Sequence, residues 1–177
     1  TPVDEARWGF SVIENSLWEA VPDFMRELDG RLNEDYDVSL PLDASPVQFS
    51  SWMGGDRDGN PFVTSKVTEQ VLLLARKRAA KLFALDLDRL QVELSMYDCN
   101  DELRDKVGDA NEPYRALLRP LVNKFIATRD GIADYLAGKN PDTSNWIESV
   151  DELIEPLMLC YQSLIDCGMQ VVANGLL

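Results

Sequence analysis

The stretch SKVTEQVLLLARKRAAKLFALDLDRLQVELSM, residues 65–96, decides the fold class. It contains neither Gly nor Pro, the two residues that interrupt helices most strongly. Apolar residues recur along it at intervals typical of one side of a long α-helix, at Val67, Val71, Leu74, Ala75, Leu82, Leu85 and Leu90. We therefore expect a helix over residues 65–96, capped at its start by Thr64 or Ser65.

Helix-start signals also mark the beginning of the chain. Thr1 precedes Pro2, and a capping residue followed by proline is typical of a helix N-terminus. We expect this helix to cover about residues 3–33, with a break at Pro22 because proline lacks the N–H group that a helix interior needs. Residues 34–63 then form a long ordered loop, and loops of that length are often functional.

Cap residues and stop signals predict three further helices, over about residues 101–107, 112–137 and 150–167. Asn100 and Asn111 are the expected caps of the first two. For the third, Ser149 and Glu152 have the spacing of a capping box. Because no stretch alternates convincingly between apolar and polar residues, we expect an all-α chain. It should form one helical segment over residues 1–177, with several long helices and an ordered Gly-rich loop.

The composition excludes several classes of function. Lys and Arg total 17 against 31 Asp and Glu, and the net charge of −14 repels nucleic acid and anionic membranes. Without histidine, the chain holds no Ser-His-Asp or Cys-His machinery and no His-ligated metal. No apolar run is long enough to cross a bilayer, and the three cysteines form no C-x-x-C pair. We expect a cytoplasmic protein that binds neither nucleic acid nor membrane.

The expected loop contains the stretch with the most chemical character, SWMGGDRDGNP at residues 51–61. Gly54, Gly55 and Gly59 permit positive φ and the close approach of a ligand to the backbone. The guanidinium of Arg57 is a planar fork suited to a carboxylate or phosphate, and Asp56 or Asp58 can orient it. The alternative is that Arg57 forms an ion pair that only braces the loop.

Two familiar ligand-binding loops do not fit this stretch. Asp56, Asp58 and Asn60 have the spacing that opens an EF-hand calcium loop. However, Pro61 and Val67 occupy the positions where that loop requires Gly and a bidentate Glu. No Gly-Lys-Ser/Thr follows, so a Walker-type phosphate loop is excluded as well. We therefore expect neither a calcium loop of the EF-hand type nor a Walker-type phosphate loop here.

Residues 51–61 resemble the glycine-rich signature of the phosphoenolpyruvate carboxylase family, and a match of this length is highly specific. The similarity, strongest to bacterial members, continues along nearly the whole chain at DEARWG (4–9), ENSLW (14–18), ELSM (93–96), EPYR (112–115), CYQS (160–163) and ANG (173–175). The resemblance implies an enzyme that joins bicarbonate to phosphoenolpyruvate, giving oxaloacetate and phosphate, and so replenishes the citric acid cycle.

The resemblance also implies a larger, mostly helical enzyme built around an α/β barrel, of which this chain is an internal piece. Such an enzyme uses Mg²⁺ or Mn²⁺ and is a homotetramer controlled by allosteric effectors. The family's histidine-containing and arginine-rich catalytic segments, and its metal-binding carboxylates, have no counterpart here. We therefore expect this piece to bind no metal itself, to hold no complete catalytic set and to be inactive alone.

Carried over residue by residue, the resemblance makes Trp52 part of the apolar wall around the substrate's methylene carbon. The chemistry of the loop itself, and not a family role, makes Arg57 the expected cation that faces phosphate or carboxylate. Gly54, Gly55, Asp56, Asp58, Gly59 and Asn60 are expected to shape the loop. Two alternatives remain open: a helical regulatory or subunit-contact module without a direct catalytic role, and a free-standing helical interaction protein.

Other conspicuous residues favour structural roles. Trp8 and Trp18 on helix faces are expected to pack in the core or between helices, and Trp146 is expected to anchor a turn. A basic cluster at Arg76, Lys77, Arg78 and Lys81 is more typical of a solvated or salt-bridged helix face than of an anion site.

Overall fold

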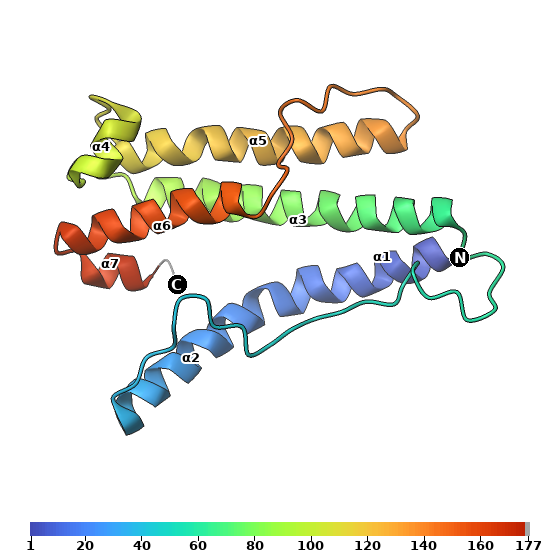
Figure 1. The fold of residues 1–177 in the computed structure, drawn as a ribbon, viewed down its shortest axis with the longest axis horizontal. Coiled ribbons are helices and arrows are strands. Elements are labelled where there is room, and N and C mark those ends of the chain that lie inside the picture. Colours follow the sequence, from blue (N-terminus) through green and yellow to red (C-terminus); the bar gives the residue numbers. More distant parts are fainter. Residues whose placement is uncertain (176–177) are drawn as a thin grey trace. The chain divides into compact units, whose positions relative to one another are not determined.

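The computed structural model describes residues 1–175. These residues form helices and loops and contain no strand, which confirms the all-α expectation for the described part of the chain. The α-helices, labelled in Figure 1, are α1 (Pro2–Val12), α2 (Trp18–Tyr36), α3 (Ser65–Glu93), α4 (Asp101–Val107), α5 (Pro113–Leu136), α6 (Asp151–Asp166) and α7 (Gln170–Asn174). A π-helical turn, η1 (Ile13–Leu17), joins α1 to α2. Within this described range, no helix is both long and apolar enough to span a membrane.

The chain divides into two compact units, where the sequence predicted a single segment. The first covers residues 1–75 and the second begins at Arg76, so α3 contributes residues to both. Each unit has its own hydrophobic core, and each is described here by itself.

In the first unit, α1, η1 and α2 follow one another without a loop. The predicted break at Pro22 is wrong, because α2 continues through this proline. The irregular turn lies earlier, at η1, where the Trp18 N–H donates to the carbonyl of Ile13, five residues back. A proline ring crowds the carbonyl four residues before it, which for Pro22 is that of Trp18. The distortion therefore ends at the residue that the proline crowds.

The end of α2 lies beyond the predicted residue 33. Asp37 adopts a left-handed conformation with φ of 54°, and its N–H donates to the Asn33 carbonyl at 3.0 Å. A single bond of this kind behind a left-handed residue is the αL type of C-cap, and the Val38 N–H also reaches back to the Leu32 carbonyl at 3.4 Å. Asp tolerates this conformation better than most residues, so the helix stops here without a glycine.

The core of the first unit is small. Ala6 and Phe10, four residues apart on α1, pack with Val71 of α3. Trp8 lies between them in sequence and therefore on the opposite side of the helix, where 74% of it is exposed. The expectation that Trp8 packs in a core is wrong for this structure.

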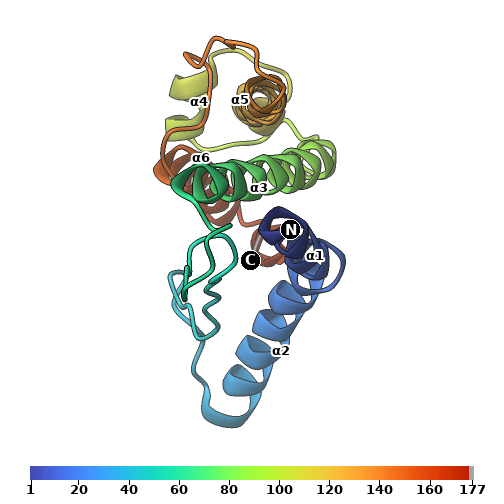
Figure 2. The ribbon, with the colours of Figure 1, turned by 90° about the vertical axis from the view of Figure 1, so that its right-hand side faces the viewer.

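The larger core lies in the second unit, where the later part of α3 runs beside α5 and α6 (Figure 1; Figure 2). Phe83 of α3 and Phe125 of α5 meet with ring centroids 5.5 Å apart. Tyr114 is fully buried, and its hydroxyl lies 2.9 Å from the Ser163 hydroxyl of α6. Burial raises the pKa of the Tyr114 hydroxyl to about 12. Cys160 is also fully buried, and burial raises the pKa of its thiol to about 12, so it behaves as a small apolar residue.

The helix caps of the second unit differ from the sequence expectations at two places. Asn100 caps α4 as expected, accepting from the Leu103 N–H at 3.0 Å. Asn111 does not cap α5, whose N-cap is Glu112 without a side-chain bond. Ser149 does not complete a capping box either, because α6 starts after Val150.

Candidate functional site

The signature loop, residues 51–61, has a fixed base. Gly54 is buried, and with φ of 74° it lies so close to α3 that an added Cβ would be 2.6 Å from Val71 Cγ2. The preceding Met53 lies over Gly9 of α1, where a Cβ would meet the methionine's methyl carbon at 2.4 Å. The Thr68 hydroxyl of α3 donates to the Gly54 carbonyl at 2.6 Å. Two helices of the first unit therefore hold the loop at Met53 and Gly54.

The rest of the loop is organised by two tight turns. The Trp52 carbonyl accepts from the N–H groups of Gly55 at 3.0 Å and Asp56 at 2.9 Å. In the second turn, the Asn60 N–H donates to the Arg57 carbonyl, and Gly59 has a φ of 73°.

Asn60 also fixes the segment that leads from the loop to α3. Its side-chain carbonyl accepts from the Phe62 N–H at 3.0 Å, and its backbone carbonyl accepts from Val63 at 3.2 Å. The loop then meets α3, where Thr64 accepts from the Val67 N–H at 3.3 Å and so provides the expected cap. These bonds give the loop a defined shape although residues 55–62 are exposed.

The loop displays aromatic side chains and one cation, beside the exposed carboxylates of Asp56 and Asp58. Trp52 is 71% exposed, and Phe49 and Phe62 on either side of the signature are 59% and 73% exposed. Arg57 is also exposed. Over residues 1–175 the structure shows no ion pair or side-chain hydrogen bond between its guanidinium and Asp56 or Asp58. Its five donors thus face solvent, available to an anion.

The loop backbone offers less to an anion than its glycine content suggests. The N–H groups of Gly55, Asp56 and Asn60 are used inside the loop, and the cap of α3 uses that of Val67. The groups that the loop offers to a ligand are therefore mainly side chains, above all the planar guanidinium of Arg57 and the indole of Trp52.

The described residues provide no metal site. Nowhere in residues 1–175 do three His, Cys, Asp or Glu side chains come close enough to hold an ion. Asp56, Asp58 and Asn60 follow one another with the right spacing, but they do not gather into such a group. The divalent metal that the resemblance implies does not fit the donor sets of this part of the chain.

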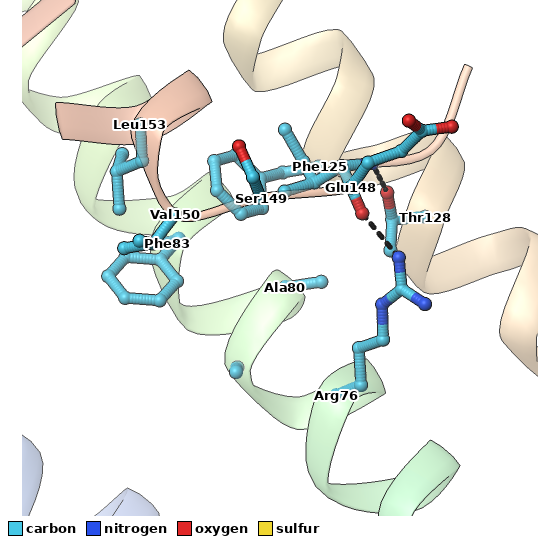
Figure 3. A pocket seen from close by; sticks show the side chains of 11 residues that line it. Arg76, Ala80, Phe83, Phe125, Thr128, Glu148, Ser149, Val150 and Leu153 are labelled. Carbon is cyan, nitrogen blue, oxygen red and sulfur yellow. Dashed lines mark hydrogen bonds between the residues drawn. The ribbon is translucent and has the colours of Figure 1, made fainter. Parts of the chain in front are cut away.

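A pocket lies in the second unit, between α3, α5 and the start of α6 (Figure 3). This pocket has a volume of about 250 Å³ and apolar walls that include Ala80, Phe83 and Phe125. Its polar rim is partly engaged, because Arg76 donates to the Ile147 carbonyl and the Thr128 hydroxyl accepts from the Ile147 N–H at 2.8 Å. The Thr128 hydroxyl also donates to the Lys124 carbonyl at 2.9 Å, whereas Arg76 is exposed and keeps further N–H donors.

Arg76 belongs to the basic cluster, and the structure uses it as a structural residue. Its guanidinium lies 5.4 Å from the ring centroid of Trp146. Trp146 is 8% exposed and rests on Gly131 of α5, so it anchors the loop before α6 as expected. Arg76 and Trp146 thus fasten this loop to α3 and α5.

The start of α6 is fixed by a charge from another helix. The carboxylate of Glu152 binds Lys124 of α5, and it also accepts from the N–H groups of Glu148 at 2.7 Å and Ser149 at 3.2 Å. The hydrogen bond from Lys124, followed by the backbone bonds, lowers the pKa of Glu152 to about 2. This is the acidic half of the predicted capping box, without the serine half.

Sequence reasoning found the displayed residues but missed their supports. Gly9, Thr68 and Val71 lie on helices whose periodicity reveals a core face and not a loop contact. The one available signal was a threonine at position 68, a polar residue one turn after the cap of α3.

Comparisons with known proteins agree with the resemblance of the signature. The family model described as phosphoenolpyruvate carboxylase matches residues 1–177. Proteins named phosphoenolpyruvate carboxylase are 54% identical over 177 residues in Tolumonas auensis, 55% over 175 residues in Pseudomonas putida and 58% over 179 residues in Chromohalobacter salexigens. These alignments cover 99–100% of this chain and 20% of each relative. The chain thus spans about a fifth of their length, and it belongs to the phosphoenolpyruvate carboxylase family.

Proposed function

We propose that this chain supplies the signature loop to the active site of a phosphoenolpyruvate carboxylase, the enzyme that forms oxaloacetate and phosphate from phosphoenolpyruvate and bicarbonate. The observation that carries the proposal is the pairing of an exposed indole with an unpaired guanidinium on a loop whose base is fixed. A loop that served only as a connection would need neither an anchored glycine nor a displayed tryptophan.

Arg57 is proposed to bind an anionic group of the substrate. Both reactants are anions, and a planar guanidinium can donate two parallel hydrogen bonds to a carboxylate or phosphate. Because Arg57 has no ion-pair partner in the loop, no internal bond must break before it binds. Its positive charge would stabilise the negative charge that develops as the phosphoryl group leaves phosphoenolpyruvate.

Trp52 is proposed to exclude water. Transfer of the phosphoryl group to bicarbonate gives carboxyphosphate and the enolate of pyruvate. Carboxyphosphate then breaks down to phosphate and carbon dioxide, and the methylene carbon of the enolate attacks the carbon dioxide. Water at this position would protonate the enolate and give pyruvate instead. An apolar indole wall beside the methylene carbon lowers the local water content and strengthens the field of nearby cations.

The remaining features come from the family resemblance. We propose that the longer chain uses Mg²⁺ or Mn²⁺ held by residues outside this segment, and that it forms an allosteric homotetramer in the cytoplasm that replenishes the citric acid cycle. No step assigned to Trp52 or Arg57 depends on the position of the metal.

The test compares Trp52→Ala with Trp8→Ala in the longer family chain. Both tryptophans are more than two-thirds exposed here, but Trp8 lies on α1 outside the loop. With phosphoenolpyruvate, bicarbonate and Mg²⁺, we expect Trp52→Ala to release a larger share of pyruvate relative to oxaloacetate. Trp8→Ala should keep the normal ratio. An unchanged product ratio and rate in Trp52→Ala would contradict the water-excluding role.

A further inference from the structure

The Thr68 hydroxyl is the side-chain contact that joins the signature loop to α3. Its oxygen lies 2.6 Å from the Gly54 carbonyl oxygen and 3.2 Å from the Thr64 carbonyl oxygen, one turn earlier in the helix. A hydroxyl has one proton to donate, so it serves one of these carbonyls at a time. The shorter distance favours Gly54.

The two carbonyls differ in how much they need this proton. The Thr64 carbonyl already accepts from the Thr68 N–H at 3.0 Å, so it stays paired without the hydroxyl. Gly54 is buried, and the donor that the described residues offer its carbonyl is Thr68. A buried carbonyl without a donor is costly, so the loop is held where this bond forms.

Gly54 also occupies a position where small displacements have large effects. It packs against Val71, and it lies two residues from Trp52 and three from Arg57. The Trp52 carbonyl closes the turn that contains Gly54. A shift of the Gly54 peptide therefore passes through this turn to both displayed side chains.

We propose that Thr68 is a positioning residue of the active site, which sets the placement of Trp52 and Arg57 through its hydrogen bond to Gly54. This inference rests on the proposed function, and it adds a residue outside the signature that touches no substrate itself. The Thr64 carbonyl is a second acceptor for the Thr68 hydroxyl, so this hydroxyl keeps a hydrogen bond when the loop moves away from α3. Thr68 thus holds the loop with a contact that can be released.

The test uses the longer family chain with Thr68→Val, which keeps the side-chain shape and removes the hydroxyl, and Thr68→Ser, which keeps the hydroxyl. We expect Thr68→Val to lower kcat/KM for phosphoenolpyruvate about tenfold, the effect of one lost hydrogen bond. Thr68→Ser should stay within about twofold of the parent. In Thr68→Val, hydrogen exchange of the loop amides should be faster, while that of α5 should not change.

A combined mutant separates positioning from general destabilisation. If Thr68 acts through Trp52 and Arg57, adding Thr68→Val to the Trp52→Ala/Arg57→Ala enzyme should lower kcat/KM by less than about threefold further. Fully multiplicative losses would overturn the inference. An unchanged kcat/KM of the folded Thr68→Val enzyme would also overturn it. So would a loss of kcat/KM in Thr68→Ser as large as that in Thr68→Val.

The inference and the proposed function fail in different ways. If Arg57→Ala and Trp52→Ala impair carboxylation but Thr68→Val does not, the positioning role is wrong and the function stands. If none of the three affects carboxylation, the loop has no catalytic role and both are wrong.

Discussion

Gly54 and Gly59 provide a matched pair of backbone positions within the signature loop. Their φ angles are 74° and 73°, so alanine meets the same left-handed conformation at both. They differ in surroundings, because a Cβ at Gly54 would lie 2.6 Å from Val71 Cγ2, whereas a Cβ at Gly59 would have no atom within 4 Å. The difference between Gly54→Ala and Gly59→Ala therefore measures the contact of the loop with α3.

The expected losses in the free energy of unfolding follow from the backbone conformation and from the contact with Val71. A left-handed alanine costs about 1–2 kcal/mol, and the lower entropy of the unfolded chain offsets about 0.4–1 kcal/mol of this. Gly59→Ala should therefore lower the free energy of unfolding by about 1 kcal/mol. Gly54→Ala adds the overpacking against Val71, about 1–3 kcal/mol, for a total of about 2–4 kcal/mol.

Urea unfolding of the 177-residue chain followed by circular dichroism would measure both losses, and hydrogen exchange at the start of α3 would assign them to the first unit. Val71→Ala makes room for the new methyl group. The double mutant Gly54→Ala/Val71→Ala should therefore be at least about 1 kcal/mol more stable than the sum of the single losses predicts. Equal losses at Gly54 and Gly59 would refute the close packing of the loop on α3.

Two further predictions concern the rest of the chain. Gly131→Ala should lower the melting temperature, because the added Cβ would lie 2.4 Å from Trp146 Nε1. Gly30→Ala, at a helix position with open space, is the control and should raise the free energy of unfolding by about 0.5–1 kcal/mol. An unchanged melting temperature of Gly131→Ala would contradict the packing of Trp146. The pKa of Glu152 falls from its usual 4.5 to about 2 in the folded chain, so its stabilising effect is complete above pH 4.5 and is lost as pH falls toward 2. Glu152→Gln should have a lower free energy of unfolding than the parent at pH 7, and this difference should disappear by about pH 2. Urea unfolding at several pH values across this range measures the difference. A difference that does not change with pH would contradict the link to Lys124.

Local signals in the sequence predicted most helices, because caps and periodicity depend on neighbouring residues. Thr1 and Asn100 cap helices where expected. Pro22 misled the prediction because a helix can keep a proline when the turn before it changes its hydrogen-bond register, as η1 does. The register of a single turn is not visible in residue types.

Contacts between distant residues explain the other differences. Glu152 is bound by Lys124, which lies 28 residues earlier, so the local spacing of a capping box did not reveal how α6 begins. The signature loop was recognisable from its glycines and charges, whereas Thr68 reaches across 14 residues to Gly54. Local pattern thus predicted what the loop displays, and the folded structure was needed to show what holds it.

The most direct test of the central claim is bicarbonate-dependent oxaloacetate formation from phosphoenolpyruvate by the longer family chain, with Arg57→Ala as the variant and Arg31→Ala as the control. Arg31 is an exposed arginine on α2, paired with Glu27 in the same helix. We predict that Arg57→Ala lowers kcat/KM at least about a hundredfold without a change in melting temperature, and that Arg31→Ala has no such effect. Activity of Arg57→Ala within about twofold of the parent would contradict a catalytic role for the signature loop.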